Sequence, residues 1–119
     1  MKTQDLFVPF ELAKQLKDKN FEPTLWFAWQ FIDGSSGENR YEVRTSFGNK
    51  VMLGIPLFSQ VTDWLLNVHN IFLSPTYCKG KIKQYDCFIE TKDSIRFSGY
   101  KPTIQEAYTS AIEEALKLI

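Results

Sequence analysis

Residues 83–119 read KQYDCFIETKDSIRFSGYKPTIQEAYTSAIEEALKLI and combine two strand patterns with a long amphipathic helix. In 83–91 apolar and polar side chains alternate, which is the period of a β-strand. The segment 92–94 has the composition of a turn, and 95–98 alternates again, so the two strands should form a hairpin. A helical pattern over 103–119 follows. A hairpin followed directly by a helix is typical of an α+β fold.

The helix expected over 103–119 has both a start signal and an apolar stripe. Thr103 and Glu106 form a capping box, in which the Thr side chain satisfies a backbone N–H of the first turn. The stripe consists of Ala107, Tyr108, Ala111, Ile112, Ala115, Leu116 and Ile119. Its small Ala side chains would let the helix lie close to a sheet.

The rest of the chain adds two helices and three strands. Helices are expected at 9–19 and 57–69, strands at 24–32, 40–47 and 71–77, and a connection at 48–56. Pro9 suits the first helical position, and Asn20 and Asn70 suit left-handed helix caps. Pro75 either confines its strand to an edge of the sheet or ends it early. The order α-β-β-α-β-β-β-α predicts an α+β fold with a mostly antiparallel sheet of about five strands, packed on one face by three helices. A length of 119 residues favours a single domain over 1–119.

Composition excludes several classes of protein. Apolar residues make up 44% of the chain and charged residues 24%, a balance that favours a globular protein over a disordered one. No apolar run approaches the roughly 20 residues of a membrane span. The segment 1–10 lacks the apolar core of a secretory signal. We therefore expect a cytoplasmic protein with reduced cysteines and no membrane partner.

Candidate catalytic residues are few. A Cys–His pair would have to come from Cys78, Cys87 and His69, but Cys87 lies on an apolar strand face and His69 at a helix end. Two cysteines and one histidine cannot alone fill a four-ligand zinc site. Asp86 and Glu90 share a strand face that we expect to be solvated. We predict no catalytic residue, no metal site and no cofactor, and hence a protein that is not an enzyme.

One segment is locally basic although the net charge of the chain is zero. Residues 71–101 contain six Lys and Arg against three Asp and Glu, an excess of three positive charges. Aromatic residues interleave with them, and this combination suits a nucleic-acid surface. The candidate contacts are Lys79, Lys81, Lys83 and Arg96. Edge strands also carry Lys to prevent aggregation, which is the alternative explanation.

The strand expected at 24–32 (TLWFAWQFI) is apolar on both faces, interrupted only by Gln30. Such a strand is either covered on both sides or exposes a surface for a partner. We predict a protein interface at Trp26, Trp29 and Ile32, or on the exposed side of the helix expected at 57–69. The partner would be an unknown protein or a second copy in a homodimer.

Three helix segments carry a resemblance to a known family. The segments LAKQLKDKNF (12–21), VTDWLLNVHNI (61–71) and EAYTSAIEEALKLI (106–119) resemble a family of small proteins of unknown function from prophages and mobile elements of gut bacteria. The resemblance implies a cytoplasmic α+β protein and carries over no catalytic residue.

The C-terminal half has a second, topological similarity. The order α-β-β-β-α from residue 57 onward, with an Ala-rich final helix, is similar to double-stranded-RNA-binding domains. Gln105 and Glu106 stand where that family has a Lys-Lys pair, and its Gly-Pro-x-His loop is missing. The similarity therefore implies the fold and not the RNA contacts. Together these features favour a non-enzymatic binding or adaptor domain making protein–protein contacts, with nucleic-acid binding through 79–101 as the alternative.

Overall fold

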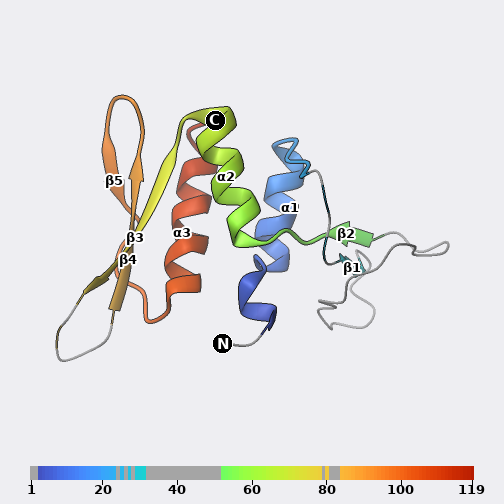
Figure 1. Cartoon of the computed structure of the whole chain (residues 1–119), viewed down its shortest axis with the longest axis horizontal. Helices are drawn as coiled ribbons and strands as arrows, with labels where there is room; N and C mark the ends of the chain where they lie inside the picture. Colours follow the sequence, from blue (N-terminus) through green and yellow to red (C-terminus); the bar gives the residue numbers. More distant parts are fainter. Residues whose placement is uncertain are drawn as a thin grey trace. The chain divides into compact units, whose positions relative to one another are not determined.

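The computed structural model describes residues 3–23, 25, 27, 29–31, 52–78, 80 and 84–119. The chain divides into two compact units, Met1–Phe58 and Ser59–Ile119. Within the described residues it contains helices and antiparallel strands in separate sheets, which confirms the α+β class (Figure 1). Among the described helices, none has the length and apolar character needed to cross a membrane.

The first unit is built around one helix and a short strand pair. Its elements are η1 Thr3–Leu6, α1 Phe10–Asp18, β1 Trp29–Phe31 and β2 Met52–Gly54. β1 and β2 pair antiparallel, with Gln30 opposite Leu53. Pro9 is the N-cap of α1 rather than its first helical residue.

Asn20 ends α1 in the way the sequence predicts. Its φ is 62°, and its N–H donates to the carbonyl of Lys17 while the N–H of Phe21 donates to that of Leu16. This pair of hydrogen bonds is a Schellman motif, and Leu16 and Phe21, which accompany it, are both buried. The left-handed cap therefore returns the chain to the apolar interior.

The second unit is a three-stranded antiparallel sheet with two helices. Its elements are α2 Phe58–His69, β3 Phe72–Cys78, β4 Gln84–Glu90, β5 Ile95–Phe97 and α3 Ile104–Leu116. The strand order is β3-β4-β5, so β3 is an edge strand, the first of the two outcomes expected from Pro75. Asn70 has φ 56° at the end of α2, the left-handed conformation expected there.

Helix α3 packs against one face of this sheet (Figure 1). The buried part of its predicted stripe comprises Ala107, Ala111, Ile112, Ala115 and Leu116. On the strands, Leu73, Cys87 and Ile89 are buried and follow the two-residue period of one sheet face. Ala side chains on the helix allow this close approach, so the core of the unit lies between α3 and one side of β3 and β4.

The single sheet of about five strands is not confirmed, since the described strands form a two-stranded and a three-stranded sheet. The expected connection needs correction. Residues 48–56, expected to be only a connection, contain β2, which pairs with β1. The expectation of a connection rested on Gly48, Gly54 and Pro56, which are typical of loops, although Met52 and Leu53 between them are apolar. The strand expected at 40–47 lies outside the described residues, and the single domain over 1–119 stays a prediction.

The capping box of α3 gives a direct test of local stability. The Thr103 hydroxyl accepts a hydrogen bond from the Glu106 N–H at 3.1 Å. Thr103→Ala should lower the free energy of unfolding by about 1 kcal/mol, because that N–H loses its partner. Urea denaturation followed by circular dichroism measures the change.

The matched control is Thr109→Ala in the middle of the same helix. The Thr109 hydroxyl only donates back to the Gln105 carbonyl within the helix, and Ala has the higher helix propensity. Equal losses in the two variants would contradict a capping role for Thr103.

Candidate functional site

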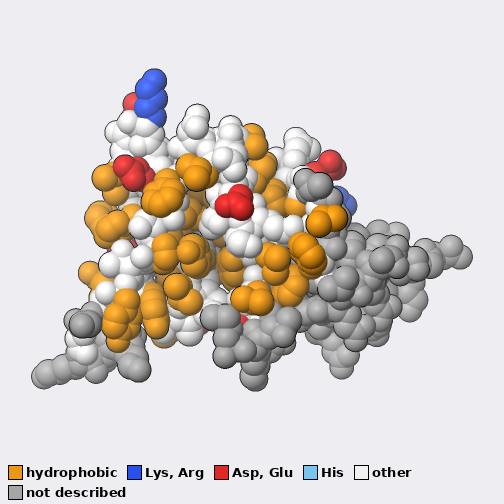
Figure 2. Space-filling view, viewed as in Figure 1, with side chains coloured by type: hydrophobic (Ala, Val, Ile, Leu, Met, Phe, Trp, Pro, Cys, Tyr) orange, Lys and Arg blue, Asp and Glu red, His pale blue; other side chains and the backbone are white. Residues whose placement is uncertain are grey.

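The face of the β3–β4–β5 sheet opposite α3 is rich in exposed apolar side chains. Phe72 is 46% exposed, Ile95 60% and Phe97 63%, and the strand period places Phe88 on the same side. We call this side, defined by these four residues, the open sheet face. Figure 2 shows hydrophobic side chains gathered over this sheet, at the left of the view. Large exposed apolar patches often mark interaction sites, so the open sheet face is a candidate interaction surface.

A hollow of about 350 Å³ lies in this surface. Its lining consists of Thr76, Cys78, Asp86, Phe88, Phe97, Gly99 and Tyr100. All these residues belong to the second unit, and they come from β3, from β4, from β5 and from the segment that follows it. The hollow is within the size range of small-ligand sites in proteins.

A β-bulge contributes to the lining of the hollow. Phe88 pairs with Phe97, and the next pairing along the two chains is Tyr85 with Lys101. Two residues of β4 therefore face three residues, 98–100, on the opposing segment, which is the count of a bulge. Gly99 takes a φ of +93° there, and a Cβ at this position would meet no atom within 4 Å. The backbone conformation, rather than steric space, therefore favours glycine.

The bulge decides which side chains share the hollow. In a regular strand Phe97 and Tyr100, three residues apart, would lie on opposite faces. The extra residue changes this relation, and both rings line the hollow. Tyr100 is 64% exposed. Bulges often re-aim a side chain in this way.

Asp86 holds the bulge in place. Its Oδ1 accepts hydrogen bonds from the Cys87 N–H at 2.7 Å, the Gly99 N–H at 3.1 Å and the Ser98 hydroxyl at 3.2 Å. The side chain thus supplies an acceptor where the inserted residue interrupts the ladder of backbone hydrogen bonds. Asp86 is only 5% exposed and is the one described polar residue of the buried set.

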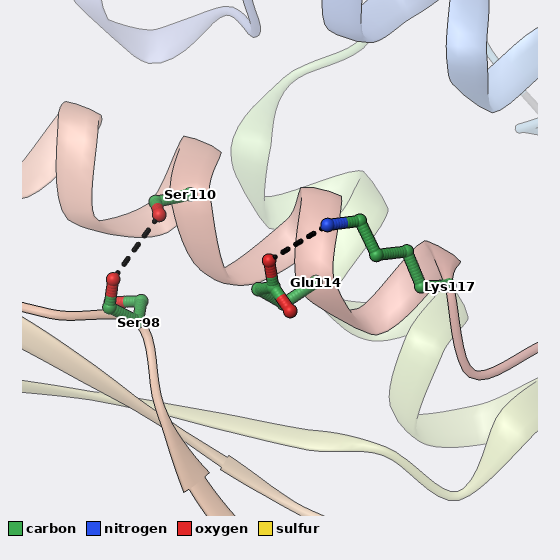
Figure 3. A network of polar contacts seen from close by, with 4 residues as sticks. All are labelled: Ser98, Ser110, Glu114 and Lys117. Atoms are coloured by element: carbon green, nitrogen blue, oxygen red, sulfur yellow. Dashed lines mark hydrogen bonds and ion pairs between the residues drawn. The ribbon is translucent and has the colours of Figure 1, made fainter.

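The bulge is also fastened to the helix behind the sheet. The Ser110 hydroxyl on α3 donates to the Ser98 carbonyl at 3.3 Å, as Figure 3 shows together with the Glu114–Lys117 ion pair of the same helix. Ser98 therefore contacts Asp86 through its hydroxyl and α3 through its carbonyl. This arrangement fixes the bulge relative to the core of the unit.

Two aromatic rings pack against each other in the hollow. Phe88 and Phe97 are directly opposite on neighbouring strands, and their ring centroids lie 4.7 Å apart at an interplanar angle of 87°. This edge-to-face geometry is favourable for aromatic pairs. The pair orders part of an exposed surface before any ligand arrives.

Cys87 lies one residue from Asp86 but on the other side of the sheet, and it is fully buried. Burial, and then the nearby Asp86 carboxylate, raise the pKa of the Cys87 thiol from 9.0 to about 12, against a smaller lowering by a backbone hydrogen bond at Ser74. Burial, followed by Cys87, also raises the pKa of Tyr108. The prediction that Cys87 is a buried apolar residue is confirmed.

The candidate contacts from the sequence fall mostly elsewhere. Trp26 and Ile32 of the expected protein interface lie outside the described residues, and Trp29 is part of β1. Of the four candidate nucleic-acid contacts, Lys79, Lys81 and Lys83 lie outside the described residues. Arg96 is exposed on β5 opposite Ile89, whose side chain is buried on the α3 side. The strand period therefore places Arg96 on the face opposite Phe97 and the hollow.

Sequence reasoning missed the central residue of the hollow. Asp86 and Glu90 were expected to be solvated together, but only Glu90 is exposed. Asp86 is buried, and it accepts hydrogen bonds from Ser98 and Gly99 of the bulge. A Ser-Gly pair directly after a strand pattern is the signal that points to such an irregularity.

Comparisons with known proteins found no similar protein. No protein-family model matches the chain, and neither the curated proteins nor the solved structures contain a significant match.

The role of Asp86 can be tested through stability. Asp86→Ala should lower the free energy of unfolding by about 3 kcal/mol, because the Gly99 N–H and Ser98 hydroxyl lose their buried acceptor. Asp86→Asn keeps an Oδ1 acceptor and should cost less than about 1 kcal/mol. Urea denaturation of both variants measures the difference, and similar losses would refute the clamp at the bulge.

The buried thiol predicts a pH dependence of stability. Its pKa is higher in the folded chain, so its contribution to stability is complete below pH 9 and is lost as pH rises from 9 towards 12. Cys78→Ala should therefore lose more stability between pH 9 and 11 than the double variant Cys78→Ala/Cys87→Ala. Urea denaturation at several pH values measures both. Parallel pH profiles would contradict the raised pKa.

Proposed function

We propose that this chain is a non-enzymatic binding module that uses the open sheet face to contact a partner protein. The observation that carries the proposal is the exposure of Phe72, Ile95 and Phe97 on the sheet face opposite α3, around a preformed hollow. Aromatic residues are enriched at protein–protein interfaces because they bury a large area with few rotatable bonds. This surface replaces 24–32 as the leading candidate interface.

The chemistry of the hollow favours binding over catalysis. Cys87, the buried thiol, lies on the other side of the sheet with a raised pKa, and a protonated thiol is a poor nucleophile. Cys78 does line the hollow. The described residues that line the hollow with it include no Lys, Arg or His that would activate a thiol. The hollow contains three aromatic rings and Asp86, whose carboxylate is engaged in structural hydrogen bonds. These groups suit the binding of a ligand without a chemical reaction.

A nucleic-acid partner is the alternative, and the described residues favour it less. Base stacking on exposed rings requires cations nearby to neutralise phosphates. Among the described residues, Arg96 lies on the face opposite Phe97, and the residues lining the hollow include Asp86 and no basic side chain. An acid beside the rings would repel a phosphate backbone.

The proposal is tested by affinity capture from a bacterial lysate, the choice suggested by the resemblance to mobile-element proteins. The tagged wild-type chain, Phe97→Asp and Val68→Asp are compared with and without nuclease, and captured proteins are identified by mass spectrometry. Val68 on α2 is 62% exposed and lies off the open sheet face, so it controls for an added charge at an exposed apolar site.

We expect one protein to be retained by the wild type and Val68→Asp after nuclease, and to be lost from Phe97→Asp. Retention by Phe97→Asp would contradict the open sheet face as the interface. Capture that disappears with nuclease would shift the function to nucleic-acid binding. Light scattering that shows a monomer at high micromolar concentration would exclude the homodimer version.

A further inference from the structure

We propose that the hollow on the open sheet face receives a Lys or Arg side chain of the partner protein, held between the aromatic rings and the Asp86 carboxylate. The inference rests on the proposed protein-binding function and names the chemistry that the binding module recognises.

The charge of the lining selects a cation. Among the described residues that line the hollow, Asp86 is the one acidic residue and no Lys, Arg or His is present. No described basic residue forms an ion pair with Asp86. A carboxylate that has no ion-pair partner among the described residues, in an aromatic-lined hollow, is complementary to an ammonium or guanidinium group.

Asp86 has acceptor capacity left for such a group. An aspartate carboxylate offers about four acceptor sites on two oxygens. All three hydrogen bonds to Asp86 from the described residues end on Oδ1. Oδ2 receives no donor from the described part of the chain, so it can accept from a ligand without loss of the bonds that hold the bulge.

The aromatic walls add a second attraction for the same ligand. The faces of Phe and Tyr rings carry negative electrostatic potential and attract cations within about 6 Å of the ring centroid. Phe88 and Phe97 stand nearly perpendicular, and Tyr100 joins them because of the bulge. The methylene stem of Lys or Arg would pack against these rings while its charged end reaches the carboxylate.

A neutral apolar side chain fits the hollow less well. It would fill the space between the rings but would remove water from Asp86 without supplying a donor. Burying an uncompensated carboxylate is unfavourable. The hollow therefore discriminates by charge as well as by shape.

The test is a titration of the full-length, ¹⁵N-labelled chain followed by two-dimensional NMR. The probes are Nα-acetyl-lysine amide and Nα-acetyl-arginine amide, with the amides of Nα-acetyl-norleucine and Nα-acetyl-citrulline as neutral probes of similar shape. We expect the cationic probes to bind at least about tenfold more tightly. Their largest shifts should fall on the Cys87 and Gly99 amides, which donate to Asp86.

Two variants, with one matched control, test which side chains of the hollow contribute to the binding of the cationic probes. Phe97→Leu keeps an apolar, exposed residue but removes a ring, and it should weaken the cationic probes about threefold. Phe72→Leu is the matched control, since Phe72 is exposed on the same face but does not line the hollow. Asp86→Asn should abolish the preference for the cationic probes. If that variant does not fold, the comparison of Phe97→Leu with Phe72→Leu still tests whether the cationic probes bind in the hollow.

Equal binding of cationic and neutral probes, no binding of either, or shifts confined to another surface would overturn the inference. The titration uses no partner protein, so its failure leaves the capture experiment, and the proposed function, intact. Loss of capture in that experiment would in turn leave a positive titration as evidence for a cation site with a different purpose.

Discussion

The second unit depends on the hydrogen bonds accepted by one oxygen, Oδ1 of Asp86. Two backbone N–H groups and one hydroxyl converge on it, and two of these donors belong to Ser98 and Gly99, which follow the last strand. Without this acceptor the bulge would leave polar groups unpaired beside the core. With it, the chain can leave the regular ladder and still pair Tyr85 with Lys101 through two short backbone hydrogen bonds. The hollow and its side chains are a consequence of that irregularity.

The two faces of the sheet have different surroundings. One is covered by α3, whose Ala residues allow close packing over Cys87 and Ile89. The other keeps aromatic side chains exposed, which carries a risk of aggregation. The edges limit that risk: β3 contains Pro75, which offers no N–H for pairing, and β5 has only three residues. Unwanted strand addition is therefore restrained while the open sheet face stays accessible.

The predictable features were those determined by local pattern. The capping Thr103, the Ala stripe of α3 and the caps at Asn20 and Asn70 follow from residues within one or two helical turns, and the structure confirms them. The pairing of β1 with β2 joins segments some twenty residues apart, which periodicity along one strand cannot specify. Asp86 was missed for a related reason. Its strand pattern places it on the open sheet face, but its hydrogen bonds to Ser98 and Gly99 depend on one inserted residue on the opposing segment.

A residue that supports the backbone can also recognise a ligand when its two oxygens have separate partners. In Asp86 the structural bonds end on Oδ1, and they restrict the rotation of the carboxyl group. Because the carboxyl group cannot rotate freely, Oδ2 is held in position as well, and the proposed ligand would lose less entropy on binding. The perpendicular Phe88 and Phe97 rings are ordered by each other in the same way. A small sheet with one covering helix can thus present a preorganised site, because the interactions that maintain its fold also fix the groups that a partner would meet.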